Sequence, residues 1–485
     1  MIDGLKPYPK MKDSGVPWLG KLPAGWEVRK LRGILRRVTK RNRPDLPLLS
    51  VVRERGVVRR NATPEDENHN YIPDDLSNYK VVLPGQFAMN KMKAWQGSYG
   101  VSQYEGIVSP AYFVFDLAGV EGRFFHVAIR SHAYVPSFAQ ASDGVRIGQW
   151  DLAEPRMREI PFAIPPLPEQ AAIVRFLDHA DRRIRRYIRA KQKLIKLLEE
   201  QKQAIIHRAV TRGLDPNVRL KPSGVEWLGD VPEHWEVRRV LSCLEGTRAG
   251  IWGDDPTPAN EADHVTCLRV ADFDMSRLSI HGSKLTKRAV PASLRNPRLL
   301  AAGDILMEKS GGGETEPVGR VVLYDENVAP HAICSNFIVR LRPNATTEPK
   351  FLLHVLAIMQ VTRRNVPCIK QTTGIQNLDE RAYLSLAIGV PPLVEQQAII
   401  ASLTNRLRPI DKAASRARRE IDLLREYRTR LIADVVTGKL DVREAAARLP
   451  DEIEEPEPLD ETEAEGDADD AGVGDADEMI EEAET

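Results

Sequence analysis

The chain has 485 residues and a formal net charge of zero, from 69 basic and 69 acidic side chains. A chain of this length is expected to form two or three domains. No uncharged apolar run approaches the roughly 20 residues that span a bilayer, and no apolar signal core opens the chain, so we expect a cytoplasmic protein without membrane contact. The four cysteines show no zinc-binding or disulfide spacing; they are Cys243, Cys267, Cys334 and Cys368.

The neutral total conceals two oppositely charged parts. Residues 451–485 contain 18 acidic and no basic side chains, so residues 1–450 keep 51 acidic against 69 basic ones. An excess of 18 positive charges attracts polyanions such as nucleic acid. The acidic segment has few large apolar residues, which predicts a disordered tail. Two interpretations stay open: a passive, solvated tail, or a tail that competes with nucleic acid for the basic part.

The N-terminal segment, residues 1–29, contains a tryptophan motif that returns later in the chain. Ser-Gly-Val-Pro-Trp-Leu-Gly at Ser14–Gly20 matches Ser-Gly-Val-Glu-Trp-Leu-Gly at Ser223–Gly229, with an offset of 209 positions. A Pro-x-x-Trp-Glu-Val-Arg sequence follows each copy. We interpret its tryptophans as hydrophobic anchors at the start of a domain, and not as base-stacking residues; they are Trp18, Trp26, Trp227 and Trp235.

Two blocks follow these motifs, residues 30–161 and 239–388, and both are rich in short β-branched and aromatic runs. In the first block we expect a helix at Phe124–Arg130 and strands at Leu48–Val52, Val81–Leu83, Ile107–Val108 and Tyr112–Phe115. In the second block we expect a helix at Phe351–Thr362 and strands at His264–Val270, Asp304–Met307, Gly319–Tyr324 and Ile333–Leu341.

Residues 165–215 and 391–441 predict two long helices of about 40 residues, roughly 60 Å each. Each opens on Pro-Pro-Leu-x-Glu-Gln and closes near a glycine, and the two copies are offset by 226 positions. Apolar residues advance in steps of 7, 4, 7, 3 and 7, the period of a coiled coil. This seam comprises Leu177, Ile184, Ile188, Ile195, Leu198, Ile205, Leu403, Ile410, Ala414, Ile421, Leu424 and Leu431.

Two amphipathic helices in separate cores are the alternative to a coiled coil. Pro409 lies inside the second helix, where it removes a backbone hydrogen bond and clashes with the preceding turn. We therefore expect a kink or break between Leu407 and Ile410.

The order of motif, block and helix, repeated once, predicts the fold. We expect an α+β protein in which two similar mixed α/β domains are separated by two long helices forming an antiparallel coiled coil, with a pseudo-two-fold internal repeat and a disordered acidic tail. Residues 216–238 carry the second tryptophan motif. The blocks align in part: Leu83–Lys91 stands against Ala301–Lys309, and Asp143–Arg146 against Thr373–Gln376.

No catalytic constellation is recognisable. Gly311–Gly313 lacks the Gly-Lys-Ser/Thr ending of a P-loop and is interpreted as a flexible hairpin loop that could approach a DNA backbone. Asp304, Glu308 and Lys309 come nearest to a nuclease cluster. Their counterparts, Gln86, Asn90 and Lys91, retain only the lysine, which favours phosphate contact over hydrolysis. We expect no metal and no cofactor in this chain.

Two clusters interleave positive charge with aromatic, amide and hydroxyl groups, a mixture suited to phosphate contacts and base-edge readout. The first comprises Lys91, Lys93, Trp95, Gln96, Tyr99 and, further along, Arg146. The second comprises Lys309, Ser310, Gly311, Arg320, Arg363, Arg364, Lys370, Gln371, Thr372 and Gln376. For any single residue a solvated surface role remains open, while the clusters together favour double-stranded DNA.

These motifs as an ensemble resemble the specificity subunit of type I restriction–modification systems. The resemblance rests on the paired Pro-Pro-Leu-x-Glu-Gln helices, the tryptophan motifs, Gly303–Leu306 and Gly374–Gln376, and covers residues 10–445. It implies a non-catalytic subunit whose two blocks are target recognition domains reading an asymmetric, bipartite DNA target.

The resemblance also implies partners. The paired helices would space the recognition domains and dock two modification subunits of a type I site-specific DNA methyltransferase and endonuclease, with or without restriction subunits. S-adenosylmethionine, ATP and Mg²⁺ would belong to those partners. Two other classes stay open: a coiled-coil structural adaptor joining two β-rich protein-interaction domains, and a stand-alone nuclease or methyltransferase.

Overall fold

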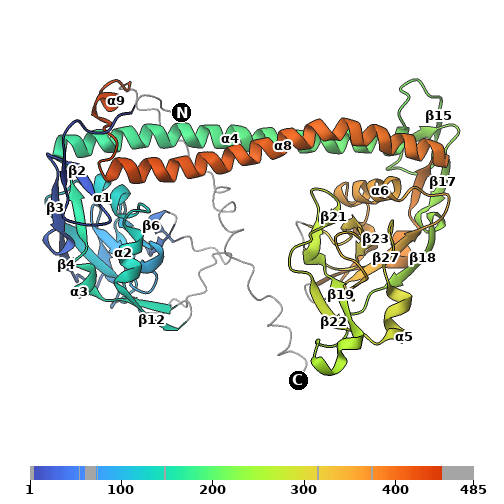
Figure 1. Ribbon diagram of the computed structural model, residues 1–485, viewed down its shortest axis with the longest axis horizontal. Helices are drawn as coiled ribbons and strands as arrows, with labels where there is room; N and C mark the ends of the chain where they lie inside the picture. Colours follow the sequence, from blue (N-terminus) through green and yellow to red (C-terminus); the bar gives the residue numbers. More distant parts are fainter. Residues whose placement is uncertain are drawn as a thin grey trace. The chain divides into compact units, whose positions relative to one another are not determined.

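The computed structural model describes residues 5–450, except 54, 61–72, 74, 147–148, 314–315 and 373–374. The predicted acidic tail, 451–485, lies outside these residues. The chain divides into two compact units: unit 1 is Met1–Arg186 with Leu424–Thr485, and unit 2 is Tyr187–Leu423. Each long helix contributes residues to both units (Figure 1).

Unit 1 is built on a four-stranded antiparallel sheet in the order β4-β11-β8-β9. These strands are Leu35–Val38, Phe113–Leu117, Phe87–Met89 and Tyr99–Val101. Two-stranded pairs surround it: β1 with β2 (Met11–Asp13, Lys21–Pro23), β3 with β14 (Glu27–Lys30, Pro161–Ile164), β5 with β6 (Leu49–Val52, Gly56–Arg59), β7 with β10 (Lys80–Val82, Gly106–Val108) and β12 with β13 (Ser142–Arg146, Gln149–Leu152). Short helices lie between these strands: α1 (Gly122–Ile129), α2 (Val135–Gln140) and α3 (Glu154–Met157).

Unit 2 has a four-stranded antiparallel sheet of the same connectivity, in the order β18-β27-β23-β25. These strands are Leu244–Ala249, Ile338–Pro343, Ile305–Glu308 and Val321–Leu323. Two three-stranded sheets accompany it: β22-β19-β26 (Thr286–Ala289, His264–Leu268, Ala332–Cys334) and β24-β29-β28 (Ser310–Gly311, Ile375–Leu378, Ile369–Thr372). The pairs are β15 with β16 (Leu220–Pro222, Asp230–Pro232), β17 with β30 (Glu236–Arg239, Ala387–Val390) and β20 with β21 (Phe273–Asp274, Ser279–Ile280), and the short helices are α5 (Ala292–Arg295), α6 (Pro349–Val361) and α7 (Glu380–Leu384).

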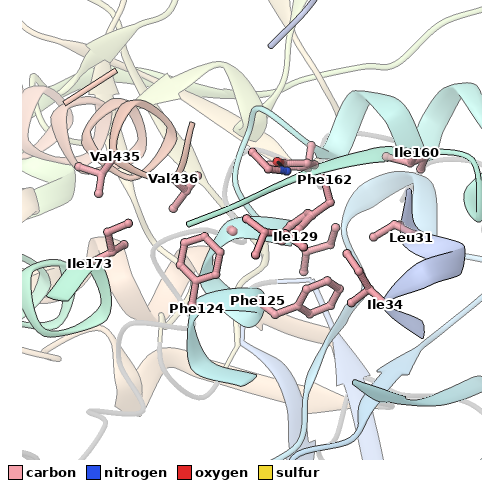
Figure 2. Packing of buried hydrophobic residues seen from close by; sticks show 14 of the residues in the cluster. Leu31, Ile34, Phe124, Phe125, Ile129, Ile160, Phe162, Ile173, Val435 and Val436 are labelled. Carbon is pink, nitrogen blue, oxygen red and sulfur yellow. Dashed lines mark hydrogen bonds between the residues drawn. The ribbon is translucent and has the colours of Figure 1, made fainter. Parts of the chain in front are cut away.

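The core of unit 1 joins the sheet, α1 and the ends of both long helices. Phe125 of α1 packs edge-on against Phe87 of β8, with ring centroids 5.2 Å apart. Figure 2 shows a neighbouring part of this core, in which residues of α1 face Phe162 of β14, Ile173 of the long helix α4 (Leu167–Arg212) and Val435 and Val436 of the long helix α8 (Leu393–Val436). The Glu121 carboxylate starts α1 by accepting hydrogen bonds from the Arg123 and Phe124 backbone N–H groups.

The two long helices are α4 (Leu167–Arg212, 46 residues) and α8 (Leu393–Val436, 44 residues), both longer than predicted. They pair in opposite directions within each unit. In unit 1, Arg428 Nε donates to Asp181 Oδ1 at 2.5 Å. In unit 2, Lys191 pairs with Glu420 at 2.6 Å and Lys202 with Asp411 at 2.7 Å, so the numbering of one helix falls as that of the other rises.

Burial along these helices follows the predicted seam. The buried seam residues are Leu177, Ile184, Ile188, Leu403, Ile410, Ala414, Ile421 and Leu431. The half-buried ones are Ile195, Leu198, Ile205 and Leu424. Residues beside the seam, such as Leu197 and Leu423, are exposed. Because parts of α4 and α8 share one apolar cluster in each unit, the alternative of helices in separate cores is wrong.

Two local expectations need correction. The helix α8 continues through Pro409 without interruption, so the predicted break is wrong, while the predicted kink stays a prediction. Packing of the flanking Leu407 and Ile410 in the core of unit 2 offsets the hydrogen bond that the proline removes. The expected strand Ile333–Leu341 is two strands in different sheets, because Ile338 N–H bonds back to the Ser335 carbonyl in a turn.

The other expected strands and both block helices occur within a few residues of their predicted positions. The short helix α9 (Arg443–Ala447) closes the described part of unit 1. Among the described helices, none has the length and apolar character needed to cross a membrane.

Candidate nucleic-acid interface

Each unit fastens its tryptophan motif to the start of a long helix. Trp26 is fully buried, and its Nε1 donates to Glu169 Oε1 at 2.9 Å. Trp235 is equally buried and donates to Glu395 Oε1 at 3.1 Å. Both glutamates belong to the Pro-Pro-Leu-x-Glu-Gln sequence. Trp26 and Trp235 are therefore confirmed as anchors, in the same role in both units.

The other two motif tryptophans differ from this pattern. Trp18 keeps 42% of its surface exposed and contacts the Tyr134 ring edge-on, at 5.0 Å between centroids. Trp227 is half-buried against the core of unit 2. Tyr8 also donates to Glu169, at 2.5 Å, and burial together with that carboxylate raises the pKa of the Tyr8 phenol above its ordinary value.

The glutamine that follows each glutamate ties the long helix to the helix of the block. Gln170 accepts a hydrogen bond from the Glu121 N–H at 2.8 Å and donates to the Pro165 carbonyl at 2.7 Å. Gln396 does the same with the Glu348 N–H at 2.8 Å and the Pro391 carbonyl at 2.9 Å. The shared sequence therefore builds one frame that holds each block in a matching way.

A hairpin in each unit lies beside the lysine that the two blocks share. The Leu152 N–H of β13 donates to the Lys91 carbonyl at 3.2 Å, and the Leu378 N–H of β29 donates to the Lys309 carbonyl at 2.8 Å. These hairpins, β12–β13 and β28–β29, together with the lysines, form the candidate interface. Their tips, residues 147–148 and 373–374, are outside the described residues.

In unit 1 the candidate interface combines a lysine ion pair with stacked aromatic rings. Lys91 Nζ lies 3.1 Å from Asp151 Oδ2, while the Lys93 side chain is exposed. Trp95 stacks on Trp150, with centroids 5.3 Å apart and planes 25° from parallel. The buried Nε1 of Trp95 has no hydrogen-bond partner among the described residues. The arrangement offers positive charge beside a rigid aromatic surface.

Trp150 was missed in the sequence, although the repeat could have located it. The helices α3 and α7 begin at Glu154 and Glu380, 226 positions apart, so Gln376 in β29 corresponds to Trp150 in β13. The predicted alignment of Arg146 with Gln376 is therefore wrong, because Arg146 belongs to the first strand of its hairpin. The Arg146 side chain lies outside the described part of the chain.

Two predicted DNA contacts are core residues instead. Tyr99 has no exposed surface; its hydroxyl donates to the Ile129 carbonyl at 3.3 Å, and burial raises its pKa. Gln376 is 7% exposed, and its Oε1 accepts from the Val318 N–H at 3.2 Å. Both predictions were wrong, since polar side chains in short strands can face either side of a sheet. Gln96 is half-buried, and its DNA contact stays a prediction.

In unit 2 the candidate interface is polar without aromatic stacking. Ser310 donates to Asn377 at 2.6 Å, beside the half-buried Lys309. Lys370 keeps 73% of its side chain exposed and pairs with Asp379 at 2.7 Å. The side chains of Gln371 and Thr372 lie outside the described part, so their contacts stay predictions.

The two carboxylates that most resemble part of a nuclease cluster in the sequence each form an ion pair with an arginine. Arg320 holds the buried Glu308 through two hydrogen bonds of 2.8 and 2.9 Å, and this contact raises the pKa of the Arg320 guanidinium. Asp304 is held in the same way by Arg342, with both distances 2.7 Å. Arg320 therefore neutralises a buried charge, and its predicted DNA contact stays a prediction.

The same buried carboxylate, that of Glu308, leaves no room for a side chain at position 311. Its φ is +125°, and a Cβ atom at this position would lie 2.9 Å from Glu308 Oε1. Only glycine lets the backbone pass the ion pair without strain.

Over the described residues, no three His, Cys, Asp or Glu side chains come together as metal ligands. All four cysteines are buried, and burial raises the pKa of Cys267 and of Cys334 to about 12.

Comparisons with known proteins agree with this geometry. A family model described as "Type I restriction modification DNA specificity domain" matches residues 294–416. The chain is similar to a protein of Methanocaldococcus jannaschii named as the type I restriction enzyme MjaX specificity subunit, with 21% identity over 447 residues, 88% of this chain and 96% of that protein. The MjaVIII specificity subunit of the same organism is 22% identical over 290 residues, 59% of this chain and 63% of that protein.

A solved structure shares the fold. It is described as "Structural basis underlying complex assembly and conformational transition of the type I R-M system". Its chain matches with a TM-score of 0.61 at 16% identity, covering 86% of this chain and 99% of that chain. Residues 294–416, in unit 2, therefore match a type I restriction modification DNA specificity domain. Over most of its length the chain is similar to type I restriction enzyme specificity subunits.

Proposed function

We propose that this chain reads an asymmetric, bipartite DNA target through its two units and catalyses no reaction itself. One observation carries the proposal: the frame is the same in both units, but the hairpins differ. Trp150 stacks on Trp95 in unit 1, whereas Gln376 and Asn377 form hydrogen bonds in unit 2. Two equal frames with unequal surfaces suit two different half-sites.

The long helices would set the distance between the half-sites. We propose that α4 and α8 form an antiparallel coiled coil joining two copies of one repeat. Their 46 and 44 residues correspond to about 65–70 Å at 1.5 Å per residue. The buried seam and the ion pairs within each unit support this. A connection of fixed length makes binding of the second half-site intramolecular and dictates the unread spacer.

The chemistry would be supplied by partners. We propose that the helices dock two modification subunits, and that restriction subunits join in the same complex. S-adenosylmethionine, ATP and Mg²⁺ would bind to those subunits. In this chain, the carboxylates that most resemble a nuclease cluster are each neutralised by an arginine. This pairing supports a role in DNA recognition and not in catalysis. An adaptor joining two protein partners would not explain a DNA specificity domain at residues 294–416.

Methylome sequencing of a host that expresses the complex tests the proposal. We expect one split, asymmetric adenine motif. Replacing residues 30–160 with the corresponding block of a related subunit should change one half-site and leave the other half-site and the spacer unchanged. A continuous or palindromic motif, or a block exchange that alters both half-sites, would contradict the proposal.

The salt dependence of DNA binding separates a reader from an adaptor. A protein that contacts 6–10 phosphates loses about 10³–10⁵ in affinity between 50 and 200 mM salt. We expect K93E to reduce the slope of log affinity against log salt by about one. R29E is a control of equal charge change, since Arg29 is exposed and pairs with Glu27 of the tryptophan motif, outside the candidate interface as defined above. Affinity that is weak and independent of salt would favour the adaptor.

A further inference from the structure

Lys80, the first residue of β7 in unit 1, is a buried lysine without a paired carboxylate. It keeps 4% of its surface exposed, and its Nζ donates to the Tyr112 backbone carbonyl at 2.5 Å. Within the described part of the chain this carbonyl is its one hydrogen-bond partner, and Glu154 acts on the ammonium only at longer range. Buried charges are normally paired, because removing an ion from water is costly. Lys80 therefore lacks a direct counter-charge among the described side chains.

Other cations surround this lysine. Arg37 of β4 and Lys80 lie over the same aromatic ring, with Arg37 Cζ 4.5 Å and Lys80 Nζ 5.9 Å from the centroid of Phe113. The ring attracts both cations and helps to hold them in place. Burial lowers the pKa of the Lys80 ammonium, and the nearby charges of Arg37, Arg41 and Lys91 lower it further. We call these four residues the unit 1 cation cluster: Arg37, Arg41, Lys80 and Lys91.

The carboxylates that pair with the unit 1 cation cluster are too few to balance it. Glu154 pairs with Arg37 and also, at 3.3 Å, with Arg158. Asp151 pairs with Lys91 at 3.1 Å. Together with Arg158, the cluster therefore brings five positive charges to two carboxylates. Such an excess of positive charge, partly buried, favours the binding of an anion.

The unit 1 cation cluster is continuous with the candidate interface. Lys91 belongs to both, and Nδ2 of the adjacent Asn90 donates to the Tyr112 hydroxyl at 3.1 Å. The carbonyl of the same tyrosine accepts the hydrogen bond from Lys80. The cluster therefore extends the candidate interface from the hairpin β12–β13 toward β4 and β7.

We propose that the unit 1 cation cluster binds a phosphate of the DNA backbone. Arg41 is exposed and Arg37 keeps 37% of its side chain exposed, so both guanidinium groups can reach a phosphate. Arginine can donate two parallel hydrogen bonds to phosphate oxygens. Lys80 acts through its charge and not through contact, because salt screens a buried charge much less than an exposed one. The inference rests on the proposed function, since DNA supplies the phosphate.

Unit 2 differs at two positions of this site. The strand registers of the two four-stranded sheets align Phe113 with Val339 of β27 and Arg37 with Thr247 of β18. Neither valine nor threonine can provide the aromatic ring or the guanidinium group. We therefore assign this phosphate site to unit 1 alone.

Neutralising Arg41 tests the site through the salt dependence of DNA binding by the full-length chain. We expect R41Q to reduce the slope of log affinity against log salt by about one, so that affinity falls about fourfold less than in the parent between about 50 and 200 mM salt. K21Q is the matched control, because Lys21 and Arg41 are both exposed and, among the described residues, neither side chain forms a hydrogen bond or ion pair. The K21Q slope should equal that of the parent.

The choice of duplex separates a phosphate contact from a base contact. Contacts to phosphate carry no sequence information. R41Q should therefore lower the affinity by the same factor for a duplex with the methylated motif of the host and for a duplex without it.

Inorganic pyrophosphate probes the site in the absence of DNA. Thermal unfolding is measured in sodium pyrophosphate and in sodium chloride of equal ionic strength, which separates binding from screening. An anion that binds only the folded chain raises the melting temperature. We expect a larger rise in the parent and in K21Q than in R41Q and K80M. Because K80M changes a buried residue, the exposed R41Q keeps the test decisive if K80M folds poorly.

Three outcomes would overturn the proposal. They are equal salt slopes for R41Q and K21Q, an equal pyrophosphate effect in R41Q and K21Q, and a loss of affinity in R41Q that is confined to the duplex with the motif. A parent chain that binds neither duplex would refute the proposed function. In that case the pyrophosphate measurement would still decide whether the cluster binds an anion.

Discussion

Replacing Trp26 with phenylalanine tests how the tryptophan motif is fastened to α4. The indole is fully buried and donates to the Glu169 carboxylate at 2.9 Å. A hydrogen bond to a charged group contributes about 1.5–3 kcal/mol, and the smaller ring leaves a cavity that costs roughly 1 kcal/mol more. We expect W26F to lower the free energy of unfolding of unit 1 by about 2–4 kcal/mol.

Hydrogen exchange measured by mass spectrometry locates this loss. Peptides covering β3 and β14 should exchange faster in W26F, while peptides covering β17 and β30 of unit 2 serve as the internal control. A double-mutant cycle with E169A isolates the bond, because alanine removes the acceptor oxygen, and we expect a coupling free energy of at least about 1 kcal/mol. Coupling indistinguishable from zero, or equal loss of protection in both units, would refute this account of the anchor.

Three further perturbations follow from the described contacts. R320A should destabilise unit 2 by about 3–5 kcal/mol in chemical denaturation, because Glu308, 1% exposed, loses its partner. Burial lowers the pKa of His354 to about 4. As the pH falls below about 6.5, the unfolded chain takes up a proton on this histidine while the folded chain does not. The free energy of unfolding should therefore have its full value above about pH 6.5 and fall by up to about 3 kcal/mol as the pH drops toward 4. G438A should cost more than about 2 kcal/mol, because its φ is +72° and its Cβ would lie 2.4 Å from a proline ring, whereas G224A, with the same φ and nothing within 4 Å, should cost about 1 kcal/mol.

Each of these has a discriminating control. R320M combined with E308Q should recover most of the loss in R320A, and an uncorrected loss would contradict the buried-charge explanation. H354Q should flatten the acid limb of the stability curve, so an unchanged slope would assign that limb to other groups. Equal melting temperatures for G438A and G224A would show that the close contact at Gly438 does not decide stability.

The long helices and most strands could be predicted because their signals are local. The proline and glycine boundaries and the 3.5-residue spacing place α4 and α8 within a few residues of their observed limits. The break at Pro409 could not be judged locally, because packing of neighbouring side chains maintains the helix. The same holds for Ile333–Leu341, where one apolar run serves two sheets.

The candidate interface was predicted less well than the fold. Lys91 and Lys309 were found because both blocks retain them, and they occupy matching positions beside the hairpins. Tyr99 and Gln376 were misassigned, because residue type alone does not reveal which side of a short strand faces the core. Trp150 was overlooked because it lies outside the local cluster around Trp95, on which it stacks.

The sequence by itself determined the duplicated plan, the seam of the long helices and the separation of charge between residues 1–450 and 451–485, because repeats, periods and composition are properties of the chain alone. Only the tertiary structure decided which polar groups are already engaged in hydrogen bonds or ion pairs within the chain. Trp26 meets Glu169 across 143 positions, and Asp304 meets Arg342 across 38. Burial and ion pairing depend on segments brought together by folding, so the residues left to contact a ligand become evident only when those pairs are known.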